Sequence, residues 1–235
     1  MDRQHRRELK HDKFVDEIGV LSSRAKENQR ILIAIGVVAV VVALAGYGIY
    51  FFRSNRERKA QDLLAAAMTT MDAPLVNPGQ PNPEAKYKTD AERGAVAEKQ
   101  FKELKAKYSG TDAAGVADLY LARIDASRND TASAKKLLDD FISGHPKSVL
   151  VGAARYSLYQ MRIDGGEAPQ VVKELTEELA KKDPALPPDS ILVLLAHSYE
   201  VQGNEAKSRE TYKRIVTEYP DSPFALEAQR RVGTA

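Results

Sequence analysis

The stretch ILVLLAHSYEVQGNEAKSRETYKRIVTEYPDSP, residues 191–223, carries the pattern that decides the fold. Two runs with apolar residues at helical spacing flank a polar turn at Gly203-Asn204, and Pro220 ends the second run. Glycine supplies the left-handed residue that closes a helix, and asparagine accepts hydrogen bonds from the free N–H groups of the next helix. The stretch therefore predicts two short helices joined by a tight turn.

Two further stretches upstream repeat this pattern, at residues 116–148 and 155–187. Pro146, Pro184 and Pro220 follow one another at intervals of 38 and 36 residues. The polar turns fall at Asn129-Asp130 and Gly165-Gly166-Glu167. Outside the apolar N-terminal segment, no alternating β-branched run indicates a strand. A period of this length, with one helix pair in each unit, predicts an all-α fold built as a helical solenoid.

The spacing of small and bulky residues in these units resembles the tetratricopeptide repeat (TPR) family. That family has bulky residues at positions 4, 7, 11 and 24, small residues at 8, 15 and 20, and proline at 32. A repeat that starts at Asp189 matches with Leu192, Leu195, Ala196, Tyr199, Gly203, Ser208, Tyr212 and Pro220. The resemblance implies a right-handed solenoid in which small residues allow close approach within a pair and large residues fill the layer to the next pair.

The other repeats match this pattern less completely. In the repeat that starts at Gly115, Asp118 and Asp125 stand where the family has bulky residues. In the repeat that starts at Gly152, Tyr159 replaces the small residue at position 8, and its register is the least certain. We assign residues 111–235 to these TPR-like repeats.

A degenerate helix pair, residues 53–110, comes before the repeats. Residues 88–108 form its expected second helix, and residues 54–72 form the first. The match to TPR positions rests on Ala97, Phe101, Leu104 and Ser109. Residues 73–84 between the two helices contain four prolines, which exclude a helix and indicate an exposed loop. The expected solenoid therefore has about four helix pairs.

Residues 31–52, ILIAIGVVAVVVALAGYGIYFF, contain no charged side chain. As a helix they span roughly 33 Å, which matches a hydrocarbon core about 30 Å thick. A signal peptide cleaved after Ala45 and a buried soluble helix are the alternatives; thirty residues precede the segment, which favours an uncleaved anchor. Small residues share one face of this helix and form an expected contact face for a second membrane helix: Gly36, Ala39, Ala43 and Gly46.

The basic head, residues 1–30, holds eight Lys and Arg and points to a cytoplasmic N-terminus. Within twenty residues of each end of the apolar segment, however, the count is four against four, so local charge sets the orientation only weakly. Phe14, Ile18 and Leu21 form one apolar stripe. The head is either an amphipathic helix on an anionic membrane surface or a solvated tail.

The charge balance and the residue inventory exclude several classes of function. Of 35 basic and 33 acidic residues, 27 of each follow residue 52, so the large domain is neutral and we expect no nucleic-acid partner. There is no cysteine, the four histidines have no metal-ligand spacing, and no catalytic motif appears. We therefore expect neither an enzyme activity nor a cofactor or metal.

Binding is the remaining function, and the concave face of a solenoid is its usual place. The TPR resemblance assigns that face to first-helix residues Leu119, Arg123, Tyr156, Gln160, Val193 and His197. The Lys and Asn clamp that one TPR subclass uses for acidic chaperone tails is missing here. An apolar and aromatic groove instead favours a nonpolar segment or a partner helix.

The whole architecture of head, single anchor and TPR-like repeats resembles the bacterial ancillary SecYEG translocon subunit family. The resemblance implies an inner-membrane protein with a cytoplasmic N-terminus and a periplasmic C-terminal domain. Its expected partners are translocon subunits, a periplasmic chaperone or secreted clients. The final residues, EYPDSPFALEAQRRVG, also resemble repeats of envelope proteins of cell division and outer-membrane assembly. This second resemblance implies a structural component that self-assembles as a homo-oligomer.

Overall fold

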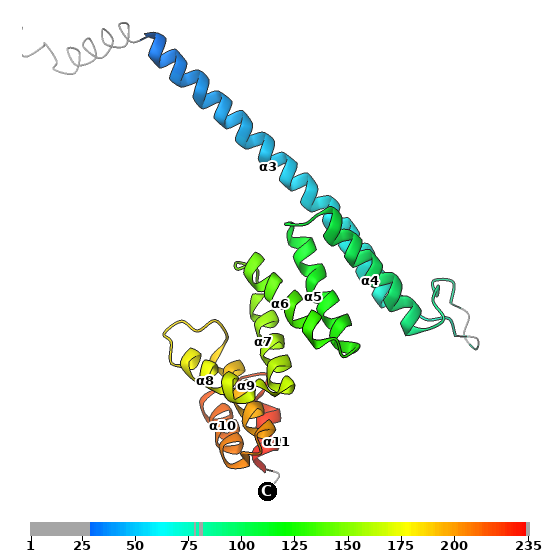
Figure 1. Cartoon of the computed structure of the whole chain (residues 1–235), viewed down its shortest axis with the longest axis vertical. Coiled ribbons are helices and arrows are strands. Elements are labelled where there is room, and N and C mark those ends of the chain that lie inside the picture. The colour runs from blue at the N-terminus through cyan, green and yellow to red at the C-terminus, as the bar shows by residue number, and fades with distance from the viewer. Residues whose placement is uncertain (1–28, 78, 80–81, 234–235) are drawn as a thin grey trace, which may run out of the picture. The chain divides into compact units, whose positions relative to one another are not determined.

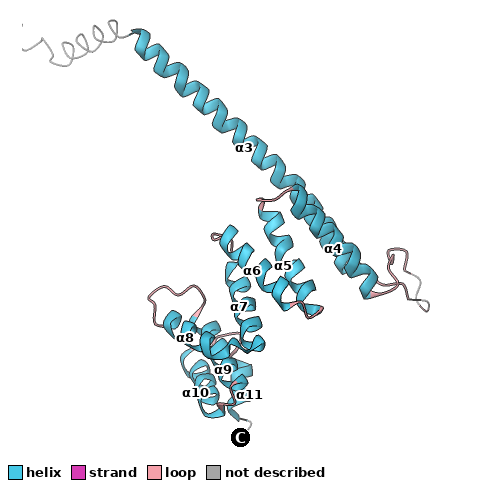
Figure 2. Ribbon diagram, viewed as in Figure 1, coloured by secondary structure: helices cyan, strands magenta, loops and turns pink. Residues whose placement is uncertain are grey.

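The computed structural model describes residues 29–77, 79 and 82–233, and their regular structure is helical (Figure 1, Figure 2). Within these ranges, the strand-like contact is an isolated bridge between Leu75 and Tyr87. The all-α expectation is therefore confirmed. The helices are α3 (Gln29–Asp72), α4 (Asp90–Lys107), α5 (Asp112–Ser127), α6 (Thr131–Gly144), α7 (Val151–Arg162), the π-helical turn η1 (Ile163–Glu167), α8 (Ala168–Leu179), α9 (Pro188–Val201), α10 (Glu205–Glu218) and α11 (Ala225–Gly233).

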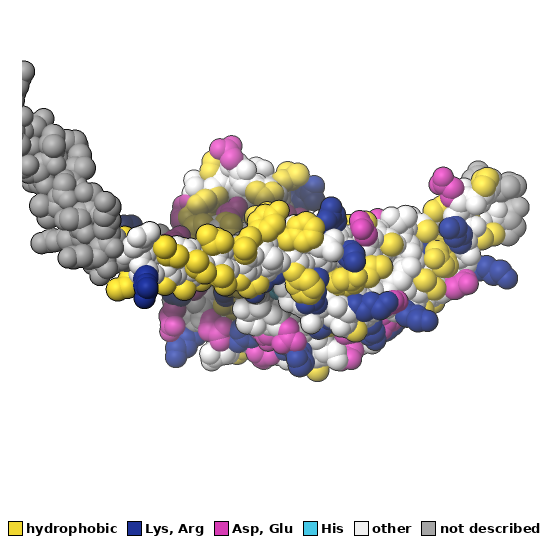
Figure 3. Space-filling model, turned by 90° about the horizontal axis from the view of Figure 1, so that it is seen from above, with side chains coloured by type: hydrophobic (Ala, Val, Ile, Leu, Met, Phe, Trp, Pro, Cys, Tyr) yellow, Lys and Arg dark blue, Asp and Glu magenta, His cyan; other side chains and the backbone are white. Residues whose placement is uncertain are grey.

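The chain divides between Asn55 and Arg56 into two compact units, and α3 contributes residues to both. In the first unit, the described residues 29–55 form one helix with its hydrophobic side chains exposed, as Figure 3 shows. Among the described helices, α3 is long and apolar enough to cross a membrane. The stripe of Phe14, Ile18 and Leu21 expected in the head lies outside the described residues.

The four small residues of the expected membrane contact face are all exposed on α3. A Cβ atom added at Gly36 or Gly46 would meet nothing within 4 Å. This face is therefore smooth and uncovered in the single chain, and the contact expected of it stays a prediction.

The second unit begins with the degenerate helix pair, formed by the end of α3 and by α4. Ala60 and Ala67 of α3 pack in one cluster with Ala97, Phe101 and Leu104 of α4, and all five are fully buried. The second helix expected over residues 88–108 is observed as α4, and three of the four matching TPR positions lie in its buried core, whereas Ser109 lies beyond its end.

Glu57 joins this pair to the next helix through a contact that the repeat pattern did not predict. Its carboxylate accepts hydrogen bonds from the backbone N–H groups of Asp112 at 2.8 Å and Ala113 at 3.1 Å. The first N–H groups of a helix lack intrahelical partners, and a negative charge there also interacts favourably with the helix dipole. Glu57 therefore stabilises the start of α5.

The turns within the repeats have the predicted chemistry. Asp130 accepts from Ser133 N at 3.1 Å at the start of α6, and Asn204 accepts from Lys207 N at 3.2 Å at the start of α10. Asn129 and Gly203 before these caps have left-handed backbones, with φ of 63° and 70°. Both turn predictions are confirmed.

The last pair, α9 and α10, has the close contact that the TPR positions predict. Ala196 at position 8 is fully buried, and Ser208 at position 20 is 4% exposed. Short side chains at these two places leave room for the helices to approach each other. The register proposed from Asp189 agrees with this burial.

The middle pair, α7 and α8, is joined by the π-helical turn η1, in which Gly166 has φ of 91°. Val171 and Leu175 of α8 are fully buried, whereas Tyr159 is only partly buried against the same cluster. Position 8 of this repeat is therefore not the fully buried small residue of the TPR pattern. Arg162 donates two hydrogen bonds to Glu174, at 2.6 and 2.8 Å, and so links the end of α7 to α8.

Candidate functional site

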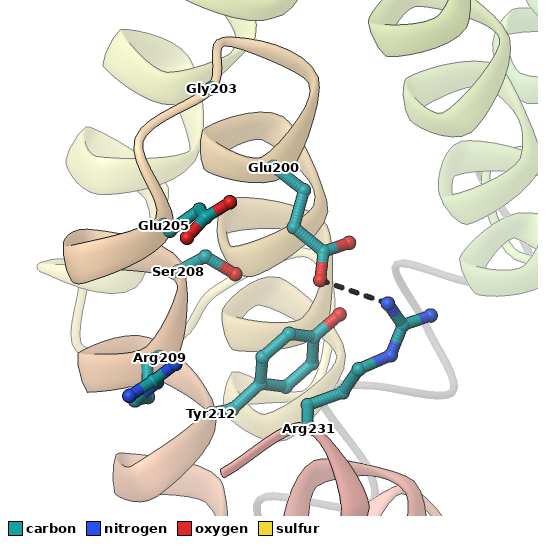
Figure 4. Close-up of a pocket in the computed structure, with 7 residues that line it drawn as sticks. All are labelled: Glu200, Gly203, Glu205, Ser208, Arg209, Tyr212 and Arg231. Carbon is teal, nitrogen blue, oxygen red and sulfur yellow. Dashed lines mark hydrogen bonds and ion pairs between the residues drawn. The ribbon is translucent and has the colours of Figure 1, made fainter. Parts of the chain in front are cut away.

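Two adjoining cavities lie among α7, α9, α10 and α11 in the C-terminal repeats. The first, which we call the groove cavity, has a volume of about 260 Å³. The second, the polar cavity, has a volume of about 450 Å³, and Figure 4 shows its lining. Glu200, Tyr212 and Arg231 border both cavities. The groove cavity is lined by Tyr156, Gln160, Val193, Leu194, His197, Glu200, Tyr212, Phe224, Glu227 and Arg231.

The structure brings together four of the six residues assigned to the concave face. Tyr156 and Gln160 on α7 and Val193 and His197 on α9 all line the groove cavity. Their α-helical spacing of four residues places each pair on one side of its helix. These four residues could therefore contact one ligand, and their binding role stays a prediction.

The other two assigned residues lie on α5 and do not line either cavity. Leu119 is partly buried and packs against the cluster that contains Ala122 and Phe141. Arg123 is exposed on the same helix. A ligand in the groove cavity would therefore have to extend along the solenoid to reach them.

Aromatic rings form the apolar wall of the groove cavity. Tyr156 of α7 stacks on Phe224, which comes just before α11, with ring centroids 6.1 Å apart and planes 13° apart. Partial burial in this wall raises the pKa of the Tyr156 phenol. Their contact joins α7 to the segment before α11 at the edge of the groove cavity.

Charged groups line the opposite part of the groove cavity. Arg231 donates to Glu200 at 3.2 Å and to Glu227 at 2.9 Å. The hydrogen bond to Glu227, together with the charge of Glu200, raises the pKa of the Arg231 guanidinium. His197 Nε2 lies 2.8 Å from Asp164 Oδ1, and its Nδ1 lies 3.7 Å from Glu200. Arg231 is thus shared by two carboxylates.

Tyr212 stands where the two cavities meet and is only 5% exposed. Its phenol oxygen points toward the Glu200 carboxylate in Figure 4, yet it has no hydrogen-bond partner within the part of the chain that the structure describes. Burial raises the pKa of this phenol to about 12, so the hydroxyl keeps its proton at neutral pH. The hydroxyl is therefore a free donor and acceptor at the junction of the two cavities.

Sequence reasoning missed the three lining residues at the C-terminal end of the site because it did not predict α11. That helix supplies Glu227 and Arg231, and Phe224 precedes it directly. The available signal was the apolar spacing of Phe224, Ala228 and Val232, four residues apart, which predicts one buried helix face.

Among the described residues, no three His, Asp or Glu side chains are grouped as metal ligands. The ion pairs at His197 and Arg231 instead join neighbouring helices. The expectation that the chain is not an enzyme stays a prediction.

Two family models match the chain. The model described as a tetratricopeptide repeat-like domain matches residues 26–189. The chain belongs to this tetratricopeptide repeat-like family. The model described as a tetratricopeptide repeat matches residues 191–222, the stretch with the clearest TPR register. As a TPR protein, the chain is a protein–protein interaction adaptor.

Comparison with solved structures finds the nearly identical TPR-like repeats of a Podosopora anserina protein described as a kinesin light chain. The identity is 14%, the match covers 75% of this chain and 84% of that chain, and the TM-score is 0.49. A single-substitution variant of the same protein matches with the same identity and coverage and a TM-score of 0.48. No curated protein matches this TPR chain.

Proposed function

We propose that the protein is a membrane-anchored TPR adaptor that binds other proteins through the groove cavity of its C-terminal repeats. The observation that carries the proposal is the groove cavity itself, where α7, α9 and α11 place aromatic and charged side chains around one space. A mixed lining of this kind suits a protein segment, because aromatic residues supply contact area while a few polar groups fix orientation.

The first part of α3 serves as the anchor in this proposal. Residues 31–52 are uncharged, and their hydrophobic side chains are uncovered in the single chain. Exposed apolar surface of this extent is typical of a helix that lies in lipid. The basic head supports a cytoplasmic N-terminus, which leaves the repeats in the bacterial periplasm.

The resemblance of the architecture to the ancillary SecYEG translocon subunit family supports a place at the Sec translocon. Translocon subunits, a periplasmic chaperone or secreted clients would then be the partners. Within the membrane, the smooth face of Gly36, Ala39, Ala43 and Gly46 would pack against a translocon helix or a second copy, because close approach of small residues favours helix association in lipid.

Mild crosslinking of intact membranes, followed by purification of the protein, tests this proposal. An adaptor should bring translocon subunits or a periplasmic chaperone with it. A structural envelope protein that self-assembles should bring mainly second copies of itself, and that result would overturn the proposal.

A further inference from the structure

We propose that the groove cavity is a receptor for one arginine side chain of the bound protein, presented between apolar residues. This inference rests on the proposed function, because it names the chemistry of the segment that the adaptor binds. It is carried by the size of the cavity, the balance of charge in its lining and the aromatic groups around it.

The groove cavity by itself has room for one long side chain. Its volume of about 260 Å³ lies below the 300 to 1,000 Å³ that is usual for small-molecule sites. If one long side chain of the partner enters the cavity, the rest of the partner's segment would lie along α7 and α9, where Gln160 and Val193 are.

The fixed charges of the lining favour a cation. Glu200 and Glu227 supply two carboxylates, and Arg231 is the single Lys or Arg among the lining residues. Asp164 lies next to His197, but its side chain is 64% exposed and does not line the cavity. Arg230 also approaches Glu227, at 3.7 Å, but its side chain is 67% exposed and does not line the cavity. The site therefore keeps excess negative charge.

The uncharged part of the lining fits a guanidinium group on an apolar stem. Tyr156 and Phe224 form a stacked wall, against which the stem of an arginine can pack. Guanidinium groups stack on aromatic faces. They also bind a carboxylate through two parallel hydrogen bonds, a geometry that an ammonium group cannot adopt. The phenol oxygen of Tyr212, a residue that is only 5% exposed, adds an acceptor where the groove cavity meets the polar cavity.

The chain's own Arg231 demonstrates the same recognition. Its guanidinium bridges Glu200 and Glu227 at the edge of the cavity, at 3.2 and 2.9 Å. An incoming arginine must share these carboxylates with Arg231. Arg231 therefore competes with the incoming arginine for the two carboxylates, and removal of its charge should strengthen the binding of a cation.

Peptide binding to the full-length protein in lipid nanodiscs tests this inference. The probe is a fluorescently labelled peptide with one central arginine flanked by leucines, and its partner peptide carries citrulline, the uncharged analogue, at the same place. Fluorescence anisotropy should show at least about tenfold tighter binding of the arginine peptide, since hydrogen bonds to charged groups contribute more than neutral ones.

Three variants make the test specific to this cavity. Glu200→Gln and Glu227→Gln should each weaken binding of the arginine peptide, whereas Arg231→Gln should strengthen it. As a control, Glu210→Gln, an exposed change on α10 outside both cavities, should leave binding unchanged. Thermal unfolding followed by circular dichroism confirms that each variant is folded.

Equal binding of the arginine and citrulline peptides would overturn the inference, and so would weaker binding after Arg231→Gln or no binding of either peptide. If the peptide test fails, the crosslinking of the protein to its partners in membranes should still succeed. Failure of the proposed function would instead show as recovery of second copies alone in that crosslinking experiment.

Discussion

Gly115 of α5 lies against the ring of His145, the residue that directly follows α6. A Cβ atom added at Gly115 would overlap the imidazole ring of His145, which also stacks on Phe141 with centroids 5.3 Å apart. The ring therefore lies directly against the backbone of α5. His145 directly precedes Pro146 in the sequence, and no local pattern indicated a contact with a residue thirty positions earlier.

Gly115→Ala should destabilise the protein by about 1 to 3 kcal/mol, because the added methyl group overpacks this contact. Urea unfolding measures the change. Gly94→Ala on α4 is the matched control: a Cβ atom there meets nothing within 4 Å. It should stabilise by about 0.5 to 1 kcal/mol through helix propensity alone. Equal effects of the two changes would show that the His145 ring moves aside freely.

Asp118 is a buried carboxyl at a position where TPR repeats have a bulky residue. It is 7% exposed, and Lys105 Nζ lies 2.6 Å from its Oδ1 in an ion pair. Burial raises the pKa of Asp118, although Lys105 opposes the shift. The folded protein therefore holds this proton more tightly than the unfolded chain does.

The effect of Asp118→Asn on the stability of the folded protein should consequently be more favourable at neutral pH than in acid. As pH rises above the ordinary aspartate value of 3.8, ionisation of Asp118 lowers the stability of the native protein but not that of the variant. Between pH 3 and pH 7, the melting temperature of the variant should rise relative to that of the native protein. The opposite trend, with the variant losing ground toward pH 7, would mean that the Lys105 attraction outweighs burial.

Helix pairs were the most predictable elements of the molecule. Turn residues such as Asp130 and Asn204 mark helix starts through local chemistry, and small residues mark close contacts. The short helix α11 was missed because it has no following partner in the repeat pattern. The Glu57 cap of α5 was missed because it joins residues 55 positions apart.

Ala196→Leu tests the close approach of α9 and α10. The larger side chain should force the pair apart and cost about 1 to 3 kcal/mol. Glu205→Ala, an exposed change on α10, should stay within about 0.5 kcal/mol of the native value. Thermal unfolding compares the two variants, and equal melting temperatures would mean that the repeat register is misaligned.

The proposed function requires that the protein keeps its membrane anchor and that its N-terminus lies in the cytoplasm. Protease added to spheroplasts should digest the chain after about Arg53 and spare the head, because lipid covers residues 31–52. Protection of the repeats, or a mature N-terminus at Gly46, would contradict this topology. Immunoblots against tags at the two ends measure the outcome.

The sequence predicted a membrane-anchored helical protein with a neutral large domain. The full lining of the binding site could not be predicted, because it forms only when the helices pack. Tyr156, Gln160, Val193 and His197 could be assigned from repeat positions alone. The cavity that they line also needs side chains from α10 and α11, which only the folded solenoid brings near them. Repeat position thus predicted four of the ten residues that line the groove cavity, and missed two on α9, one on α10 and three on or just before α11.

Photocrosslinking from the groove in living cells tests the central claim most directly. A photoreactive amino acid that replaces Val193 would lie in the groove cavity. The same amino acid in place of Lys213 would lie at an exposed position of α10 outside both cavities. If the groove cavity binds partner proteins, the group at Val193 should form adducts with translocon subunits, a periplasmic chaperone or secreted clients, and the group at Lys213 should form far fewer. Equal adducts from both positions, or adducts with second copies alone, would contradict the central claim.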